Sequence, residues 1–252
     1  METEVPIKTT ETMFEIVEVL LEQDGARFTS LIGELDMAES TLYDHLTTME
    51  SLGLLAKQDQ VYRVSTELFD MGEKTRRQRR IYRAARDEVK RLAVETGEHA
   101  TLMVEEAGEG VLLDVQKGEN AVDINAYPGR HLPLSPHAPG KAILAYLPED
   151  RVEEILDEHG LPKYTEQTTT DRDELWEELE QIREQGYAID DEELITGVRA
   201  VAVPVRNRGQ IWGTITIGGP TNRMQNEFFE TDLLDSLMQA TNIVELNLNV
   251  PS

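Results

Sequence analysis

The sequence contains no cysteine, few aromatic residues and no long apolar run. The absence of cysteine excludes disulfides, thiolate metal sites and a cysteine nucleophile. No stretch has the roughly eighteen consecutive apolar residues of a membrane-spanning helix. The start, METEVPIKTT, has neither the basic nor the apolar region of a signal peptide. We therefore expect a cytoplasmic protein with no membrane partner.

Basic residues are also scarce: 24 lysines and arginines stand against 49 acidic residues, for a net charge of -25. Such an excess of negative charge opposes compaction unless salt screens the repulsion. The composition thus suggests a halophilic protein that works at high internal salt, and full folding at low salt would contradict this. Simple solubility is the alternative explanation.

Positive charge is concentrated in residues 74–86, which contain seven basic residues and no acidic one. Apolar residues recur along this segment every three or four positions, at Ile81, Ala85, Val89 and Leu92. This spacing predicts a helix with one apolar seam and one basic face, which Gly97 ends. We expect a linker helix that pairs with a second copy of the chain and lies near phosphates.

Three short helical patterns precede this segment, at residues 13–20, 31–35 and 40–52. Thr29 or Ser30 is the candidate N-cap of the second helix. Only a short turn separates the second and third patterns, which is the spacing of a helix-turn-helix. Residues 55–64 have the β-favouring composition of a hairpin. Together these patterns predict a winged helix-turn-helix.

Apolar spacing on the third helix leaves one polar face free to contact DNA bases and phosphates. This face carries Ser40, Thr41, Tyr43, Asp44 and Thr47. Asp44 either accepts from a cytosine amino group or pairs with His45. Phosphate contacts are expected from the wing and the basic segment, at Arg63, Lys74, Arg76, Arg77, Arg79 and Arg80.

Beyond Gly97 the expected strands are grouped and do not alternate with helices, which favours an α+β domain with an antiparallel sheet. The expected strands cover residues 100–105, 111–116, 121–125, 200–205 and 211–217, and the expected helices 141–147, 149–158, 171–185 and 226–247. The predicted domains are a DNA-binding domain (1–68), a basic linker and dimerisation helix (69–97) and a C-terminal domain (98–252).

Two stretches, LPLSPHAPGKAIL at 132–144 and GYAIDDEELITGVRAVAVPV at 186–205, resemble the effector domain of the IclR family of transcription regulators. IGGP at 217–220 follows in the same order, so the resemblance covers nearly the whole chain, as an acidic, haloarchaeal-type member. It implies a GAF-like effector-binding domain and a homodimer or dimer of dimers on a near-palindromic double-stranded DNA operator. It also implies a small-molecule effector, an organic acid or a sugar derivative, and no cofactor.

The resemblance further implies which residues line the effector pocket: Leu132, Ala138, Pro139, Gly140, Asp190, Ala200, Thr216 and Gly218. The free N–H groups of the helix that starts near Ala138 would form an anion site, which Lys141 would strengthen. Asp190 would accept from a ligand hydroxyl. The chain departs from the family at Asp44, where many members have arginine, and at Ala200, where some have cysteine.

Two other function classes remain as alternatives. A metal-dependent enzyme would need His131, His137 and the acids at 190–192 to converge, although their spacing matches no metal-ligand motif. Gly140 and Lys141 lack the earlier glycine and the hydroxyl residue of a P-loop. The other alternative is a ligand-independent DNA-binding protein whose C-terminal domain serves assembly. The expected protein is a regulator and not an enzyme.

Overall fold

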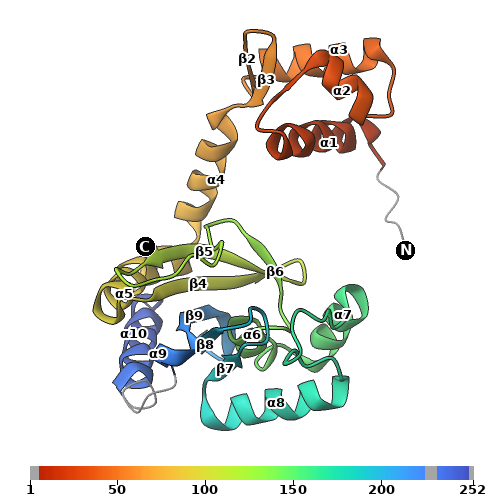
Figure 1. Cartoon of the computed structure of the whole chain (residues 1–252). Coiled ribbons are helices and arrows are strands. Elements are labelled where there is room, and N and C mark those ends of the chain that lie inside the picture. Colours follow the sequence, from red (N-terminus) through yellow and green to blue (C-terminus); the bar gives the residue numbers. More distant parts are fainter. Residues whose placement is uncertain (1–5, 225–231, 250–252) are drawn as a thin grey trace. The chain divides into compact units, whose positions relative to one another are not determined.

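The structure is a computed structural model that describes residues 6–224 and 232–249. The chain forms two compact units, and the boundary between Thr75 and Arg76 falls within helix α4 (Thr66–Gln78). Figure 1 labels the elements along the chain. No helix of the described ranges combines the length and apolarity that crossing a membrane requires.

The first unit is a winged helix-turn-helix. Its elements before α4 are α1 (Lys8–Glu22), β1 (Ala26–Arg27), α2 (Phe28–Glu34), α3 (Glu39–Ser51), β2 (Leu55–Gln58) and β3 (Val61–Val64). The strands form an antiparallel sheet in the order β1-β3-β2. Asp59 and Gln60 join β2 to β3 with φ of 51° and 66°, the signs of a tight type I′ hairpin. The core contains Ile16, Leu20, Leu31, Leu42, Leu46 and Met49, as the helical periodicity predicted, whereas Leu52, at the end of the third apolar pattern, is exposed.

Helix starts in this unit differ from the prediction. Helix α2 begins at Phe28 and α3 at Glu39, after Arg27 and Ala38 in extended conformation. Neither of these N-cap residues provides a side-chain hydrogen bond, so the expected cap at Thr29 or Ser30 is wrong.

The linker expected as a single helix over 69–97 is two helices, α4 and α5 (Arg80–Thr96). Arg79 is extended (φ −65°, ψ 120°) and interrupts the helical path. The Arg83 guanidinium donates to the carbonyl oxygens of Arg77 (3.1 Å) and Gln78 (2.9 Å). The last carbonyl groups of a helix have no backbone N–H donor within the helix, and these bonds provide donors for two of them at the end of α4.

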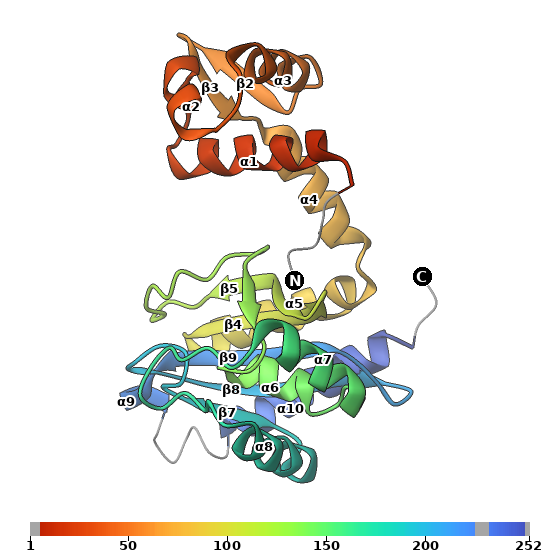
Figure 2. The same cartoon turned by 90° about the vertical axis from the view of Figure 1, so that its right-hand side faces the viewer.

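The second unit contains a six-stranded antiparallel sheet in the order β6-β5-β4-β9-β8-β7, and Figure 2 shows this order from β5 to β7. Its strands are β4 (His99–Glu106), β5 (Glu109–Lys117), β6 (His131–Pro133), β7 (Ala188–Asp191), β8 (Val198–Asn207) and β9 (Gln210–Pro220). The remaining helices are α6 (Ala138–Leu144), α7 (Glu149–His159), α8 (Arg172–Gln185), α9 (Thr221–Met224) and α10 (Leu234–Asn247). Helices α5 and α10 pack on one face of the sheet, and α6 to α8 lie on the other (Figure 1).

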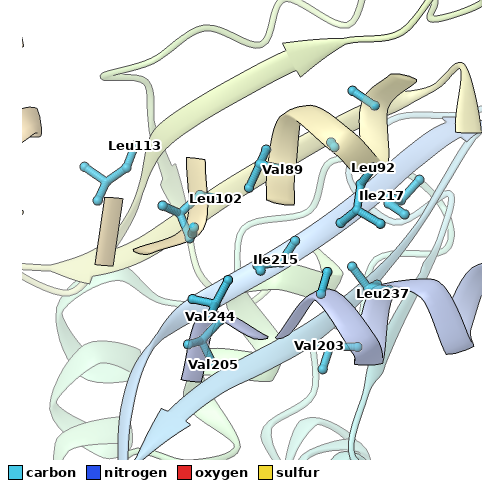
Figure 3. Packing of buried hydrophobic residues seen from close by; sticks show 14 of the residues in the cluster. Val89, Leu92, Leu102, Leu113, Val203, Val205, Ile215, Ile217, Leu237 and Val244 are labelled. Atoms are coloured by element: carbon cyan, nitrogen blue, oxygen red, sulfur yellow. The ribbon is translucent and has the colours of Figure 1, made fainter. Parts of the chain in front are cut away.

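One face of the central strands carries large aliphatic side chains. Leu102, Val203 and Ile215 belong to the core that these strands form with α5 and α10 (Figure 3). The apolar seam of α5 is part of the same core, through Val89 and Leu92. The sequence suggested that this helix pairs with a second copy of the chain through its apolar seam. The sheet of the same unit buries the seam, so the seam cannot be the pairing surface, and pairing of the helix itself stays a prediction.

Regular elements of the second unit follow the predicted order with four differences. Residues 121–125, expected as a strand, have no regular structure, while the short elements β6, β7 and α9 were not expected. Helix α8 is capped by Asp171, whose carboxylate accepts from the backbone N–H groups of Asp173 and Glu174. Of the helix expected over 226–247, residues 226–231 lie outside the described residues.

The core of α5 gives a direct stability test. Leu92 is fully buried, whereas Val94 in the same helix is 74% exposed. We expect Leu92→Ala to lower the free energy of unfolding by about 2–5 kcal/mol, because it leaves a cavity. Val94→Ala should change it by less than about 0.5 kcal/mol. Denaturant unfolding in concentrated KCl measures both, and similar losses in the two variants would contradict the packing described.

Candidate functional site

The second face of the same central strands carries small and polar side chains and forms the floor of a cavity. His99, Thr101 and Met103 of β4 alternate with the aliphatic residues that face α10. Thr216 of β9 lies opposite Thr101, and Gly218 lies opposite both His99 and Ala200. These small residues leave an internal space of about 90 Å³.

The walls of the cavity come from three segments that are distant in sequence. They are the stretch 124–132, the start of α6 and the turn between β7 and β8. The wall residues are Ile124, Ala126, Arg130, Leu132, His137, Pro139, Asp190, Leu194, Ile195 and Val198. Loops and a helix end therefore form the walls of the cavity, which is partly open to solvent, while the sheet forms its floor.

Six of the eight residues predicted for the effector pocket line this one cavity: Leu132, Pro139, Asp190, Ala200, Thr216 and Gly218. Ala138 and Gly140 are buried beside it but do not line it. A Cβ atom at Gly140 would lie 2.0 Å from the carbonyl oxygen of Leu134, so close packing requires this glycine. Sequence reasoning missed His99, Thr101 and Arg130. The small and polar residues that alternate with large ones in β4 could have indicated the first two.

The start of α6 is not the free anion site that was expected. His137 caps this helix, because its Nδ1 accepts from the backbone N–H of Gly140 at 2.9 Å. Lys141, expected to attract an anion there, is 1% exposed and forms ion pairs with Glu178 and Glu193. Its charge is therefore neutralised within the protein.

This buried ion-pair cluster holds the turn between β7 and β8 in place. The Lys141 ammonium donates to Oε1 of Glu193 at 2.7 Å, and the Thr169 hydroxyl donates to Oε1 of Glu178 at 2.6 Å. The backbone N–H of Glu193 donates to Oδ1 of Asp190 at 2.7 Å. Because Leu194 and Ile195 follow directly and line the cavity, the cluster fixes one of its walls.

Several polar atoms of the lining residues are buried without a hydrogen-bond partner in the described part of the chain. His99 Nε2 lies 2.6 Å from the carbonyl oxygen of Val122, which can only accept, so Nδ1 of the neutral ring is an unpaired acceptor. In His137 the accepting atom is Nδ1, so Nε2 carries the proton and is an unpaired donor. The Thr216 hydroxyl is also unpaired. Each such group costs free energy unless a ligand or water satisfies it.

Burial also changes the charge of two lining residues. It raises the pKa of Asp190 to about 7, with a further contribution from the nearby Glu193 carboxylate. It lowers the pKa of His137 to about 4, helped by the positive charges of Lys141 and Arg130. At neutral pH the cavity therefore contains an uncharged imidazole and a carboxyl group that readily takes up a proton.

Histidines and acids that could have formed a metal site are not gathered together. Within residues 6–224 and 232–249, no group of three or more such side chains is placed to hold a metal ion. His131 instead lies beside the Glu109 carboxylate, at 3.1 Å, on the surface.

The polar face predicted for the recognition helix is at the surface of the first unit. Ser40, Thr41, Tyr43, Asp44 and Thr47 are all exposed on α3, and Arg63 is exposed on β3. The Tyr43 ring packs edge-on against Phe28, with 6.4 Å between ring centroids, which orients its hydroxyl. The intrahelical alternative for Asp44 gains no support, because no Asp44–His45 ion pair occurs among the described residues.

Residues of the basic segment differ in their surroundings. Lys74 forms an ion pair with Asp70, and Arg79 forms one with Glu106. Arg76 is half-buried, donates to the carbonyl oxygen of Leu113 (3.3 Å) and stacks on Tyr82, with 4.7 Å from its guanidinium carbon to the ring centroid. Arg76 therefore helps to build the second unit. Arg77 is exposed and Arg80 half-buried.

Comparison with known proteins identifies the family. Residues 74–245 match the model described as "Bacterial transcriptional regulator IclR C-terminal". The probable HTH-type transcriptional regulator ArcR of Halobacterium salinarum is 31% identical over 239 residues, which cover 93% of this chain and 91% of ArcR. The chain belongs to the IclR family. It is therefore a helix-turn-helix transcription regulator and not an enzyme.

Solved IclR structures share the fold along almost the whole chain. The Thermotoga maritima IclR crystal structure is similar with a TM-score of 0.83 and 28% identity, covering 96% of this chain and 99% of that one. An IclR homolog from Microbacterium hydrocarbonoxydans, complexed with 4-hydroxybenzoate, has a TM-score of 0.80 and 23% identity, covering 94% and 98%.

The raised pKa of Asp190 predicts how stability depends on pH. A carboxyl that is protonated in the fold stabilises it fully below its unfolded pKa near 4, and this stabilisation is lost as the pH rises to about 7. Asp190→Asn keeps a neutral group at all pH values. Its free energy of unfolding relative to wild type should therefore rise between pH 4 and 7, by at most about 4 kcal/mol.

Urea unfolding at several pH values and constant KCl measures this difference. The lowered pKa of His137 acts in the opposite direction, since its stabilisation is lost as the pH falls from 6.5 to about 4. This contribution is present in both proteins and cancels in the comparison. Asp191→Asn, in the adjacent exposed position, controls for the loss of a carboxylate as such. A pH-independent difference for Asp190→Asn would contradict the assignment.

Proposed function

We propose that this IclR-family regulator binds a near-palindromic operator as a homodimer or dimer of dimers. A small metabolite, an organic acid or a sugar derivative, binds in the cavity of the second unit and alters operator affinity. The cavity with unpaired polar groups carries this proposal, because each such group costs about 1–3 kcal/mol when left unsatisfied. The 4-hydroxybenzoate complex of the Microbacterium homolog supports it.

DNA recognition is assigned to two kinds of residue. The exposed face of α3 enters the major groove, where Ser40, Thr41, Tyr43, Asp44 and Thr47 contact bases and phosphates. Arg63, Lys74, Arg77, Arg79 and Arg80 contact phosphates, which positions the protein without reading sequence. Arg76 is left out of this set because the second unit uses its side chain.

Exposed apolar side chains on the first unit fit a second copy of the chain. Phe14 and Leu21, seven residues apart on one face of α1, are 58% and 64% exposed. Phe69 of α4 is 74% exposed. A palindromic operator requires two recognition helices, so pairing of two such surfaces is consistent with the proposed function.

The regulatory mechanism is a shift between two populated states. A ligand that binds one state more tightly changes how the copies pack and alters the separation of the two recognition helices. The size of the effect equals the difference in ligand affinity between the two states. A cytoplasmic location and high internal salt fit this role, and the Halobacterium salinarum relative supports the high-salt interpretation.

Fluorescence anisotropy with the gene's own upstream DNA tests operator binding, in concentrated KCl with excess random duplex as competitor. We expect specific binding that survives the competitor. Arg77→Ala should weaken binding to all sequences alike and reduce the salt dependence by about one unit, because one phosphate contact is lost. Thr47→Ala should weaken binding to the operator more than binding to random DNA.

Arg172→Ala provides the matched control, because this exposed arginine lies on α8 and pairs with Glu153 and Asp157. It should leave both affinity and salt dependence unchanged. No specific binding to the upstream region or to neighbouring promoters would favour a protein whose second unit serves assembly.

A further inference from the structure

We infer that the cavity ligand is a small monocarboxylate with an apolar body, and that Arg130 is the residue that selects its carboxylate. This inference rests on the proposed effector function of the same cavity and narrows it. It excludes sugars and other uncharged polyols as the main ligand class.

The lining of the cavity is mostly apolar. Its side chains include Met103, Leu112, Ile124, Leu194, Ile195 and Val198. A polyol placed against these residues would bury several hydroxyls without partners, which disfavours its binding. An apolar body avoids this cost and gains free energy from its own burial.

Arg130 provides the positive charge of the lining. Its guanidinium donates to the carbonyl oxygens of Asn125 (2.6 Å) and Ile124 (3.4 Å), which hold it in place at the cavity wall. It is also close enough to lower the pKa of His137. Among the described residues no carboxylate forms an ion pair with it, although the chain has 49 acidic residues and 24 basic ones. A half-buried arginine without a carboxylate partner can bind the carboxylate group of a ligand.

The other charged and titratable groups around Arg130 do not oppose an anion. Asp190 is the one acid among the lining residues, and because its pKa is raised to about 7, its protonated form donates a hydrogen bond to a ligand carboxylate. His137 is neutral and offers Nε2–H as a donor. Behind the wall, Glu178 and Glu193 are both paired with Lys141. The site thus offers one positive charge and hydrogen-bond donors, which a single carboxylate complements, while the unpaired Nδ1 of His99 is left to accept from a water molecule.

The size of the cavity limits the ligand. Its volume of about 90 Å³ is below the roughly 150 Å³ of a cavity known to hold benzene. An acid of roughly four or five carbon atoms has at least as many non-hydrogen atoms as benzene, so with its carboxylate at Arg130 it fills this space and extends into the open mouth of the cavity. We therefore choose isobutyrate and isovalerate as probes, with isobutyramide and isovaleramide as uncharged analogues of the same shape.

Thermal shift and isothermal titration calorimetry on the full chain, in concentrated KCl, test the inference without DNA. We expect both acids to raise the melting temperature and both amides, as well as the polyol erythritol, to have little effect. Arg130→Gln should weaken acid binding roughly ten- to a hundredfold, because a charge-assisted hydrogen bond is lost. Arg130→Lys keeps the charge and should retain part of the affinity. Arg208→Gln, which removes an exposed arginine from the β8–β9 turn, should bind like wild type.

The outcomes separate this inference from the proposed function. Amides or erythritol binding as tightly as the acids, equal acid binding by Arg130→Gln, or no binding of either acid would overturn the inference. Binding of a neutral compound that also alters operator affinity would overturn the inference but support the proposed function. Arg130-dependent acid binding without any change in operator affinity would support the inference and contradict the proposed function. The melting temperature of each unliganded variant verifies that it folds.

Discussion

The two faces of the sheet impose opposite packing requirements on the same three strands. Along β4, β8 and β9, side chains alternate between the core shared with α10 and the floor of the cavity. Ile215 and Ile217 fill the first face, while Thr216 between them points to the second. Small side chains at Ala200 and Gly218 cannot fill the space above them, so the fold keeps a cavity open. The tightly packed face stabilises the sheet, and this allows the opposite face to remain incompletely filled.

The cavity walls depend on the buried ion-pair cluster around Lys141. A buried ammonium is tolerated only when carboxylates neutralise it, and here Glu193 and Glu178 do so from two different elements. Removing one partner would leave an uncompensated charge, so the turn that carries Leu194 and Ile195 stays attached to α6. In the same turn the backbone N–H of Glu193 donates a hydrogen bond to the Asp190 carboxyl group. Ion pairs within the protein therefore fix one wall of the cavity, although Lys141 itself does not line it.

Sequence patterns predicted the elements whose signals are local and repeated. Helical periodicity gave the winged helix and the buried face of α5, and the family resemblance gave six cavity residues. The packing partner of the apolar seam of α5 was predicted wrongly. Apolar periodicity shows that one face of a helix is buried, but it does not show which element buries that face. Arg130 and His99 were missed, since their role depends on loop closure and strand register between distant segments. At the break at Arg79, the Arg83 side chain donates to carbonyl groups at the end of α4. Helix propensities describe single residues and do not predict such a contact.

The central claim is that a ligand in the space above Ala200 controls DNA binding. Its most direct test is the operator affinity of wild type and of Ala200→Leu, each with and without saturating isovalerate. The added side chain would occupy the cavity floor, and Ala200 belongs neither to α3 nor to the basic segment. We predict that isovalerate changes the operator affinity of wild type at least severalfold, and that Ala200→Leu binds the operator but does not respond. An equal response of both proteins, or no response of wild type although isovalerate binds it, would contradict the account.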